Sequence, residues 1–171
     1  PIGGEGFVPG ETELLRWDAS SGNTPFTLEY TTDGGVLWNT ITTSAGVNSS
    51  YYNWTVPNTI TNEAKVRVSR NGFLDESDAD FTIVGVPQNV TVNWICPDSI
   101  YVLWNSVNGA TEYEVSMLGN VYMDSMTTTA NLTALIVNPN PAITDSWFSV
   151  CAKANGNKGR RAVAINAQPI N

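Results

Sequence analysis

The sequence contains no histidine, and this absence removes most of the common chemistry of enzymes. Without histidine there is no Ser-His-Asp or Cys-His nucleophile, no His-ligated zinc, and no imidazole general base. The glycine patterns that open nucleotide-binding sites, G-x-G-x-x-G after a strand and G-x-x-x-x-G-K-[ST], are also missing. We therefore predict that the chain is not an enzyme by itself and that it has no catalytic residue, no metal site and no cofactor.

Basic residues and long apolar runs are scarce as well. Eight Lys and Arg stand against sixteen Asp and Glu, which gives a net charge of −8. Binding to nucleic acid needs a basic stripe, so nucleic acid is not an expected partner. No run of eighteen apolar residues is present, so no membrane span is expected. We expect the chain to be a fragment of a longer secreted protein.

Residues that favour strands and turns dominate what is present. Hydrophobic residues make up 42% and charged residues 14%, with abundant Thr, Ser, Asn and Gly. A tryptophan followed nine residues later by an aromatic residue occurs twice, at Trp17 with Phe26 and at Trp104 with Tyr113, and the tryptophans are 87 residues apart. That spacing is the length of one small β-sandwich. The chain is therefore predicted to be all-β, with two tandem seven-stranded β-sandwiches over residues 1–85 and 86–171.

Alternation of apolar and polar residues locates the expected strands. Strand parity places Trp17, Trp54 and Trp104 in the cores. The strands are expected at residues 6–8, 12–17, 26–30, 36–41, 51–56, 64–68 and 79–83 in the first half, and at 90–94, 100–104, 113–117, 121–123, 135–137, 147–154 and 161–165 in the second.

Two cysteines, Cys96 and Cys151, are the only ones in the chain. An even pair in an all-β domain suggests an exported protein with one disulfide. Closing this loop of about 55 residues would contribute roughly 4 kcal/mol in the chain-entropy view. The alternative is a pair of buried free thiols. Strand parity adds a constraint, because Cys151 points outward if its neighbours Val150 and Ala152 point inward.

The stretch from Thr31 to Trp38 is the most motif-like part of the chain. It resembles the Asp-box hairpin of sialidases through Thr31, Asp33, Gly35 and Trp38, with threonine where that pattern prefers serine. The expected content is a tight turn in which the carboxylate accepts backbone N–H groups and the tryptophan packs over the hairpin. A single such box predicts a structural device. A sialidase would need several boxes and a cluster of arginines.

Four acids, at Asp75, Glu76, Asp78 and Asp80, crowd the turn before the last strand of the first half. Oxygen ligands at this spacing could hold calcium. The other interpretation is a solvated acidic turn, because alternate strand residues point to opposite faces and no EF-hand glycine is present.

The second half resembles a fibronectin type III domain, and the first half an immunoglobulin-like or fibronectin-like sandwich. The resemblance of the second half rests on Trp104, on the run from Gly109 to Val115 and on the run from Val150 to Gly156, with Trp147 near the usual place of a tyrosine. Both halves together resemble paired modules of large secreted proteins from Bacteroidota-type bacteria, including type IX secretion cargo such as peptidases and adhesins. The resemblance rests on segments such as Asn53-Trp54-Thr55-Val56-Pro57 and Gly159-Arg160-Arg161-Ala162.

That resemblance implies a non-catalytic spacer and interaction role, in a protein that is secreted or on the extracellular cell surface. The implied partners are neighbouring domains of the same polypeptide, and cell-surface proteins or glycans. The alternatives are a glycan-binding module of a secreted hydrolase and part of a secreted peptidase whose catalytic domain lies elsewhere. Glycan binding would use exposed aromatic rings. The candidates for this stacking are Trp38, Tyr51, Trp94 and Trp147.

Two serines fit the short acidic-hydroxyl-aliphatic pattern that Bacteroidota use for O-glycosylation. They are Ser99, within Asp98-Ser99-Ile100, and Ser125, within Asp124-Ser125-Met126. The resemblance implies that these are modification sites, whereas the plain alternative is ordinary turn residues. Access favours Ser125.

Overall fold

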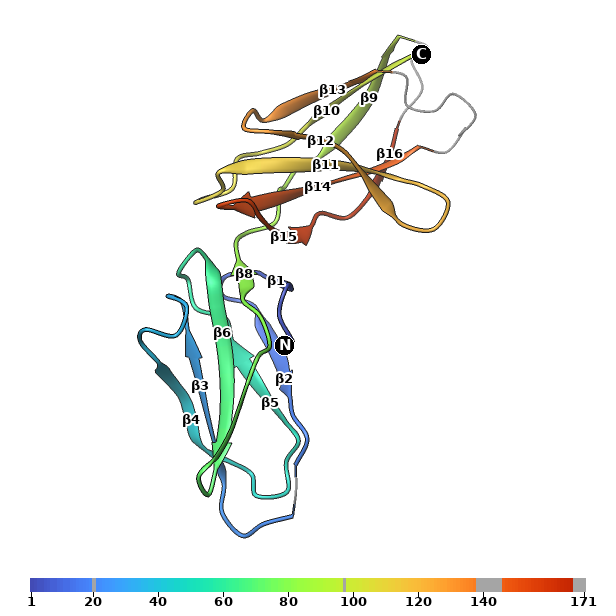
Figure 1. Ribbon diagram of the computed structural model, residues 1–171. Helices are drawn as coiled ribbons and strands as arrows, with labels where there is room; N and C mark the ends of the chain where they lie inside the picture. Colours follow the sequence, from blue (N-terminus) through green and yellow to red (C-terminus); the bar gives the residue numbers. More distant parts are fainter. Residues whose placement is uncertain (20, 97, 138–145, 168–171) are drawn as a thin grey trace. The chain divides into compact units, whose positions relative to one another are not determined.

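The computed structural model describes residues 1–19, 21–96, 98–137 and 146–167, apart from the side chain of Cys96. It divides into two compact units, Pro1–Ile83 and Val84–Asn171 (Figure 1). Every regular element in the described ranges is a β-strand, which confirms the all-β prediction. No helix in these ranges is long and apolar enough to cross a membrane.

The first unit pairs a large sheet with a small one. The small sheet contains only β2 (Thr12–Arg16) and β5 (Tyr51–Thr55). The large sheet has the order β1 (Gly6–Phe7), β8 (Phe81–Ile83), β6 (Thr61–Arg70), β3 (Phe26–Thr31), β4 (Asn39–Ala45), with β7 (Phe73–Glu76) also on β6.

Trp54 on β5 lies at the centre of the first core and is 3% exposed. Its ring centre is 6.3 Å from that of Phe7, 5.6 Å from that of Tyr30 and 6.2 Å from that of Phe81. The contacts with Phe7 and Phe81 are edge-on, and the contact with Tyr30 is tilted; such ring pairs stabilise a core beyond the area they bury. Trp17, by contrast, lies half-buried at the rim against Phe26, so the predicted core position of Trp17 is only partly right.

Two features of the first unit differ from the predicted strands. β4 begins at Asn39, because Val36 and Leu37 belong to a turn and are 87% and 63% exposed. The strand β7 was not predicted. It arises because Asn71 and Gly72 both adopt positive φ, 52° and 82°, and return the chain along β6. The described residues of this unit therefore form eight strands.

The second unit also contains two sheets. One has the order β13 (Thr133–Val137), β10 (Ser99–Leu103), β9 (Thr91–Cys96). The other has the order β12 (Met123–Thr129), β11 (Glu112–Leu118), β14 (Trp147–Ala154), β15 (Asn157–Arg161), with β16 (Ile165–Asn166) also on β14.

The core of the second unit lies between these sheets. Trp104 is 4% exposed and packs on Tyr113, with ring centres 5.5 Å apart. The Tyr113 hydroxyl accepts a hydrogen bond of 2.8 Å from the backbone N–H of Val107, which fixes the turn before β11. Val115 and Val150 are fully buried in this core.

The strand β14 has the predicted bounds, but two neighbouring expectations were wrong. The expected strand at 121–123 is a turn, with Val121 72% and Tyr122 78% exposed, and β12 starts only at Met123. The expected strand at 161–165 is two short strands, β15 and β16, that pair with different ends of β14. The described residues here also form eight strands.

We predict that the two units unfold independently. Replacing Trp54 by alanine should destabilise the first unit by about 3–5 kcal/mol, and Trp104→Ala the second by a similar amount, because each empties a separate core. Calorimetry of the full chain should show two transitions, each moved by one variant only. Equal movement of both transitions by either variant would contradict independent folding.

Candidate functional site

The turn between β3 and β4 is held by a compact set of hydrogen bonds. The Thr31 hydroxyl donates to Asp33 Oδ1 at 2.6 Å, and the same oxygen accepts from the Leu37 N–H at 2.9 Å. Thr31 Oγ1 in turn accepts from the Gly35 N–H at 3.1 Å. Gly34 and Gly35 take φ values of 69° and 98°, which favour glycine. The hydrogen bond from Leu37 lowers the pKa of Asp33 most, and the bond from Thr31 comes second.

Trp38 follows this turn and is covered by a charged pair. The guanidinium carbon of Arg67 lies 4.1 Å from the centre of the Trp38 ring, and Arg67 Nε lies 2.8 Å from Glu29 Oε2. One face of the indole is thus occupied by Arg67. The four residues predicted as an Asp-box-like hairpin, Thr31, Asp33, Gly35 and Trp38, therefore lie together as a rigid turn. Asp33 is engaged by its own turn rather than turned toward a cavity.

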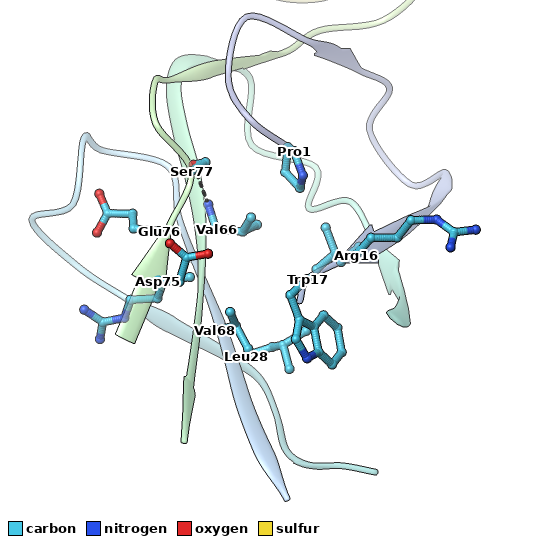
Figure 2. A pocket seen from close by; sticks show the side chains of 11 residues that line it. Pro1, Arg16, Trp17, Leu28, Val66, Val68, Asp75, Glu76 and Ser77 are labelled. Carbon is cyan, nitrogen blue, oxygen red and sulfur yellow. Dashed lines mark hydrogen bonds between the residues drawn. The ribbon is translucent and has the colours of Figure 1, made fainter. Parts of the chain in front are cut away.

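An open depression of about 650 Å³ lies on another side of the first unit, between the end of β2 and β7. It adjoins a smaller hollow of about 60 Å³, drawn in Figure 2, whose floor includes Leu28, Val66 and Val68. Trp17 lines both, and its buried indole N–H has no hydrogen-bond partner among the described residues. The two sheets of the first unit are therefore not packed tightly against each other beside Trp17.

The residues of β7 alternate across the edge of this hollow. Asp75 pairs in register with Val68, so it lies on the inner face of its sheet, whereas Glu76 pairs with Arg67 and lies on the outer face. Figure 2 accordingly shows the Glu76 carboxylate directed away from Trp17. On that outer face Glu76 Oε1 is 2.9 Å from Lys65 Nζ.

This alternation also separates the acids that were considered as calcium ligands. Among the described residues, no group of three His, Cys, Asp or Glu side chains could hold a metal ion. Asp75 and Glu76 point to opposite faces, and Asp78 and Asp80 lie beyond the end of β7. Closeness in sequence therefore does not bring these four carboxylates together.

The four aromatic residues considered for glycan stacking do not gather on one sheet. In the first unit Trp38 precedes β4, while Tyr51, 55% exposed, lies on β5 of the other sheet. In the second unit Trp94 lies on β9 and Trp147, 40% exposed, on β14, again in different sheets. Trp94 pairs in register with the buried Ile100 and so lies on the inner face.

A buried polar cluster covers the outer face of β11 and β14. Glu114, 4% exposed, places Oε2 2.8 Å from Lys158 Nζ and Oε1 3.4 Å from Arg161 Nη2. The Ser116 hydroxyl donates to the same carboxylate at 3.3 Å. Burial alone would raise the pKa of Glu114, but the hydrogen bond and charge of Lys158 outweigh it, and the pKa is lowered.

Cys151 lies in this cluster, directly opposite Glu114 in the register of β11 and β14. In its reduced form Cys151 is 1% exposed, and burial, followed by the charge of Glu114, raises the pKa of its thiol. Cys151 points away from the sheet that contains β9 because its neighbours Val150 and Ala152 are in the core. The side chain of Cys96 lies outside the described residues, so the disulfide stays a prediction.

Both candidate glycosylation serines are strand residues. Ser99 is the first residue of β10, half-buried, with its hydroxyl 3.1 Å from Asp98 Oδ1. Ser125 lies within β12, exposed, and its hydroxyl hydrogen-bonds to Glu114. Ser125 is the more accessible of the two.

Sequence reasoning missed the depression beside Trp17 and the cluster around Glu114. The turn Asn71-Gly72, followed by Phe73 to Glu76, is the signal that could have revealed β7 and therefore the inward position of Asp75. For Glu114, the signal was its place between Tyr113 and Val115 in an apolar strand, with Lys158 and Arg161 as cations in a later strand.

We predict a pH-dependent effect of Asp33→Asn. Because the pKa of Asp33 is lowered in the folded chain, its charge stabilises the turn above the pKa of the unfolded chain. That contribution is lost as the pH falls through the folded-state pKa. The variant should therefore lower the melting temperature of the first unit at pH 7, and the difference should shrink toward pH 3. Asp18→Asn, an exposed acid outside the turn, is the control; an equal effect of both variants would contradict a special role for Asp33.

We also predict glycosylation at Ser125 in preference to Ser99 in protein from the native organism, because Ser125 is more exposed. Glycopeptide mass spectrometry measures the occupancy of each site. Fully unmodified peptides containing Ser99 and Ser125 would rule the modification out.

No family model matches the chain, and no curated protein matches it. Solved structures of fibronectin type III domains are among those similar to it. A segment of two fibronectin type III domains from chicken tenascin is 16% identical, with 92% of this chain and 93% of that chain covered and a TM-score of 0.45. The FN1–FN3 domains of chicken CNTN1 are 13% identical over 95% of this chain and 67% of that chain, with a TM-score of 0.44. An Fn3-like protein from Clostridium thermocellum is 15% identical over 50% of this chain and 92% of that chain, with a TM-score of 0.42.

Proposed function

We propose that the chain is a pair of non-catalytic accessory modules, serving as a spacer and interaction region in a larger secreted or cell-surface bacterial protein. Its partners would be the neighbouring domains of that polypeptide and proteins or glycans at the cell surface. The observation that carries the spacer role is the way in which the first unit holds its two ends.

The first and last strands of the first unit lie side by side and run parallel. Gly6 pairs with Thr82 and Phe7 with Ile83. Three further backbone bonds extend this contact, from the N–H of Gly4 to Asp80 O at 2.8 Å, of Ala79 to Ile2 O at 3.1 Å, and of Thr82 to Glu5 O at 2.9 Å. Because the two strands are parallel, a force that pulls the ends of the unit apart acts along them. It therefore loads all of these bonds at once, in shear, instead of breaking them one after another. Such a clamp suits a domain that carries tension.

The start of the second unit supports the same role. Val84 is fully buried and packs so closely on Gly159 that a Cβ there would meet Val84 Cγ1. Pro87 is also among the fully buried residues. The last strand of the first unit, β8, ends at Ile83, and the buried Val84 is the next residue along the chain.

Single-molecule stretching of the full chain tests this proposal. Two unfolding events are expected, each releasing roughly 30 nm at about 3.6 Å per residue. The first unit should open at the higher force, because β9 and β16 at the ends of the described second unit do not pair with each other.

Ala79→Pro is the diagnostic variant, since proline removes the N–H that bonds to Ile2. It should lower the opening force of the first unit, while Ala79→Ser, which keeps that N–H, should not. A first unit that opens at low force in the unchanged chain, or an opening force that Ala79→Pro leaves unaltered, would contradict the spacer role.

A further inference from the structure

The small sheet of the first unit has an unpaired edge along β2. The only strand that pairs with β2 in the described residues is β5. The Glu11 carbonyl accepts from Val56 and the Trp17 N–H donates to Ser50, so these odd-numbered residues point their backbone groups toward β5. In an antiparallel pair the alternate residues point the other way. The N–H and C=O groups of Thr12, Leu14 and Arg16 therefore face the open edge.

The strand β7 also has an open edge, and it lies across the 650 Å³ depression from the end of β2. The Ser77 N–H donates to Val66 O on β6, and by the same alternation the backbone groups of Leu74 and Glu76 point away from β6. The depression of about 650 Å³ is lined from both strands, by Arg16 and Trp17 and by Asp75 and Glu76. Unpaired strand edges of this kind readily accept another strand.

The chemistry of the depression indicates what such a strand would carry. The lining of the depression is largely polar, and the smaller hollow that adjoins it has an apolar floor, with Leu28, Val66 and Val68. Asp75 lies on the inner face of its sheet, is exposed, and has no ion-pair partner among the described residues. Arg16 lies on the opposite face of β2 from the buried Leu15, so its guanidinium is directed outward, as Figure 2 shows. The first unit has eleven acidic and four basic residues, which also favours a basic partner.

We propose that an extended segment of a partner protein, with a lysine or arginine among the apolar side chains of its inner face, docks along the free edge of β2 as a third strand of the small sheet. Its backbone pairs with Thr12, Leu14 and Arg16. On its inner face the apolar side chains lie toward the smaller hollow and the cation reaches Asp75. Strand addition of this kind takes affinity from backbone bonds and selectivity from side-chain pockets. The inference deepens the interaction role proposed above and is independent of the clamp between β1 and β8.

The inward-facing Asp75 also hinders the addition of a neutral or acidic strand, because such a strand would bury the Asp75 carboxylate without a partner. A cation on the incoming segment removes that penalty. Asp75 is thus the residue that makes the edge selective.

The test uses the full chain, labelled with nitrogen-15, and an acetylated and amidated peptide of sequence Thr-Val-Thr-Lys-Thr-Val-Thr, in which Lys and both Val share one face. Saturable NMR shifts are expected at the amides of Thr12, Leu14 and Arg16. Two further peptides carry Thr or Glu in place of Lys, and they should bind more weakly. Asp75→Asn should weaken the Lys peptide about two- to fivefold, the range for an exposed ion pair, and should abolish its advantage over the Thr peptide.

Leu14→Pro and Leu14→Thr form the matched pair of variants. Proline removes an N–H from the open edge but none from the bonds to β5, so the fold should persist while affinity falls about tenfold. Threonine keeps that N–H and should bind as the original chain does. Melting temperatures of both variants check the fold.

Three results of the peptide titrations would overturn the proposal. They are no saturable shift at millimolar peptide, equal binding by the two Leu14 variants, and shifts centred away from β2. Concentration-dependent dimerisation that protects β2 would also overturn it, because the edge would then belong to a second copy. A failed titration together with an intact force clamp would leave the spacer role standing.

Discussion

The first unit depends on one wide ring, Trp54, because a sheet of two strands has to cover a much larger sheet. Trp54 meets Phe7, Tyr30 and Phe81, residues that come from β1, from β3 and from β8. A single side chain thus bridges the small sheet to three strands of the large one. It cannot also reach the side where β7 returns, and there the half-buried Trp17 is left at the rim of an open hollow. The central packing and the open edge of β2 both follow from the small size of the two-stranded sheet.

Charge is handled differently in the two units. In the second, Glu114 is buried but is held by Lys158 and Ser116, so its carboxylate is fully engaged within the sheet. In the first, Asp33 is engaged by its own turn, whereas Asp75 remains available at an open edge. A carboxylate that is already paired contributes to the fold, and one without a partner is able to select a ligand. This difference is why Asp75 carries the binding proposal and Glu114 does not.

Period-two alternation was enough to predict the all-β fold and most strands, since Leu28, Ala64 and Phe148 are buried where the pattern places them. The turn from Thr31 to Trp38 was also visible from its residue types. Exposed apolar residues misled the prediction, because Val36 and Leu37 resemble a strand although the turn's hydrogen bonds fix them outside it. The hollow could not be predicted, because it depends on which strands remain unpaired at a sheet edge. Local sequence does not encode that.

The most direct measurement of this arrangement is amide hydrogen exchange along β2 in the full chain. If β2 pairs only with β5, protection should alternate, with slow exchange at Leu15 and Trp17 and fast exchange at Thr12, Leu14 and Arg16. Uniformly slow exchange across all five residues would show that both edges of β2 are already paired. That result would contradict the open edge on which the account of the first unit rests.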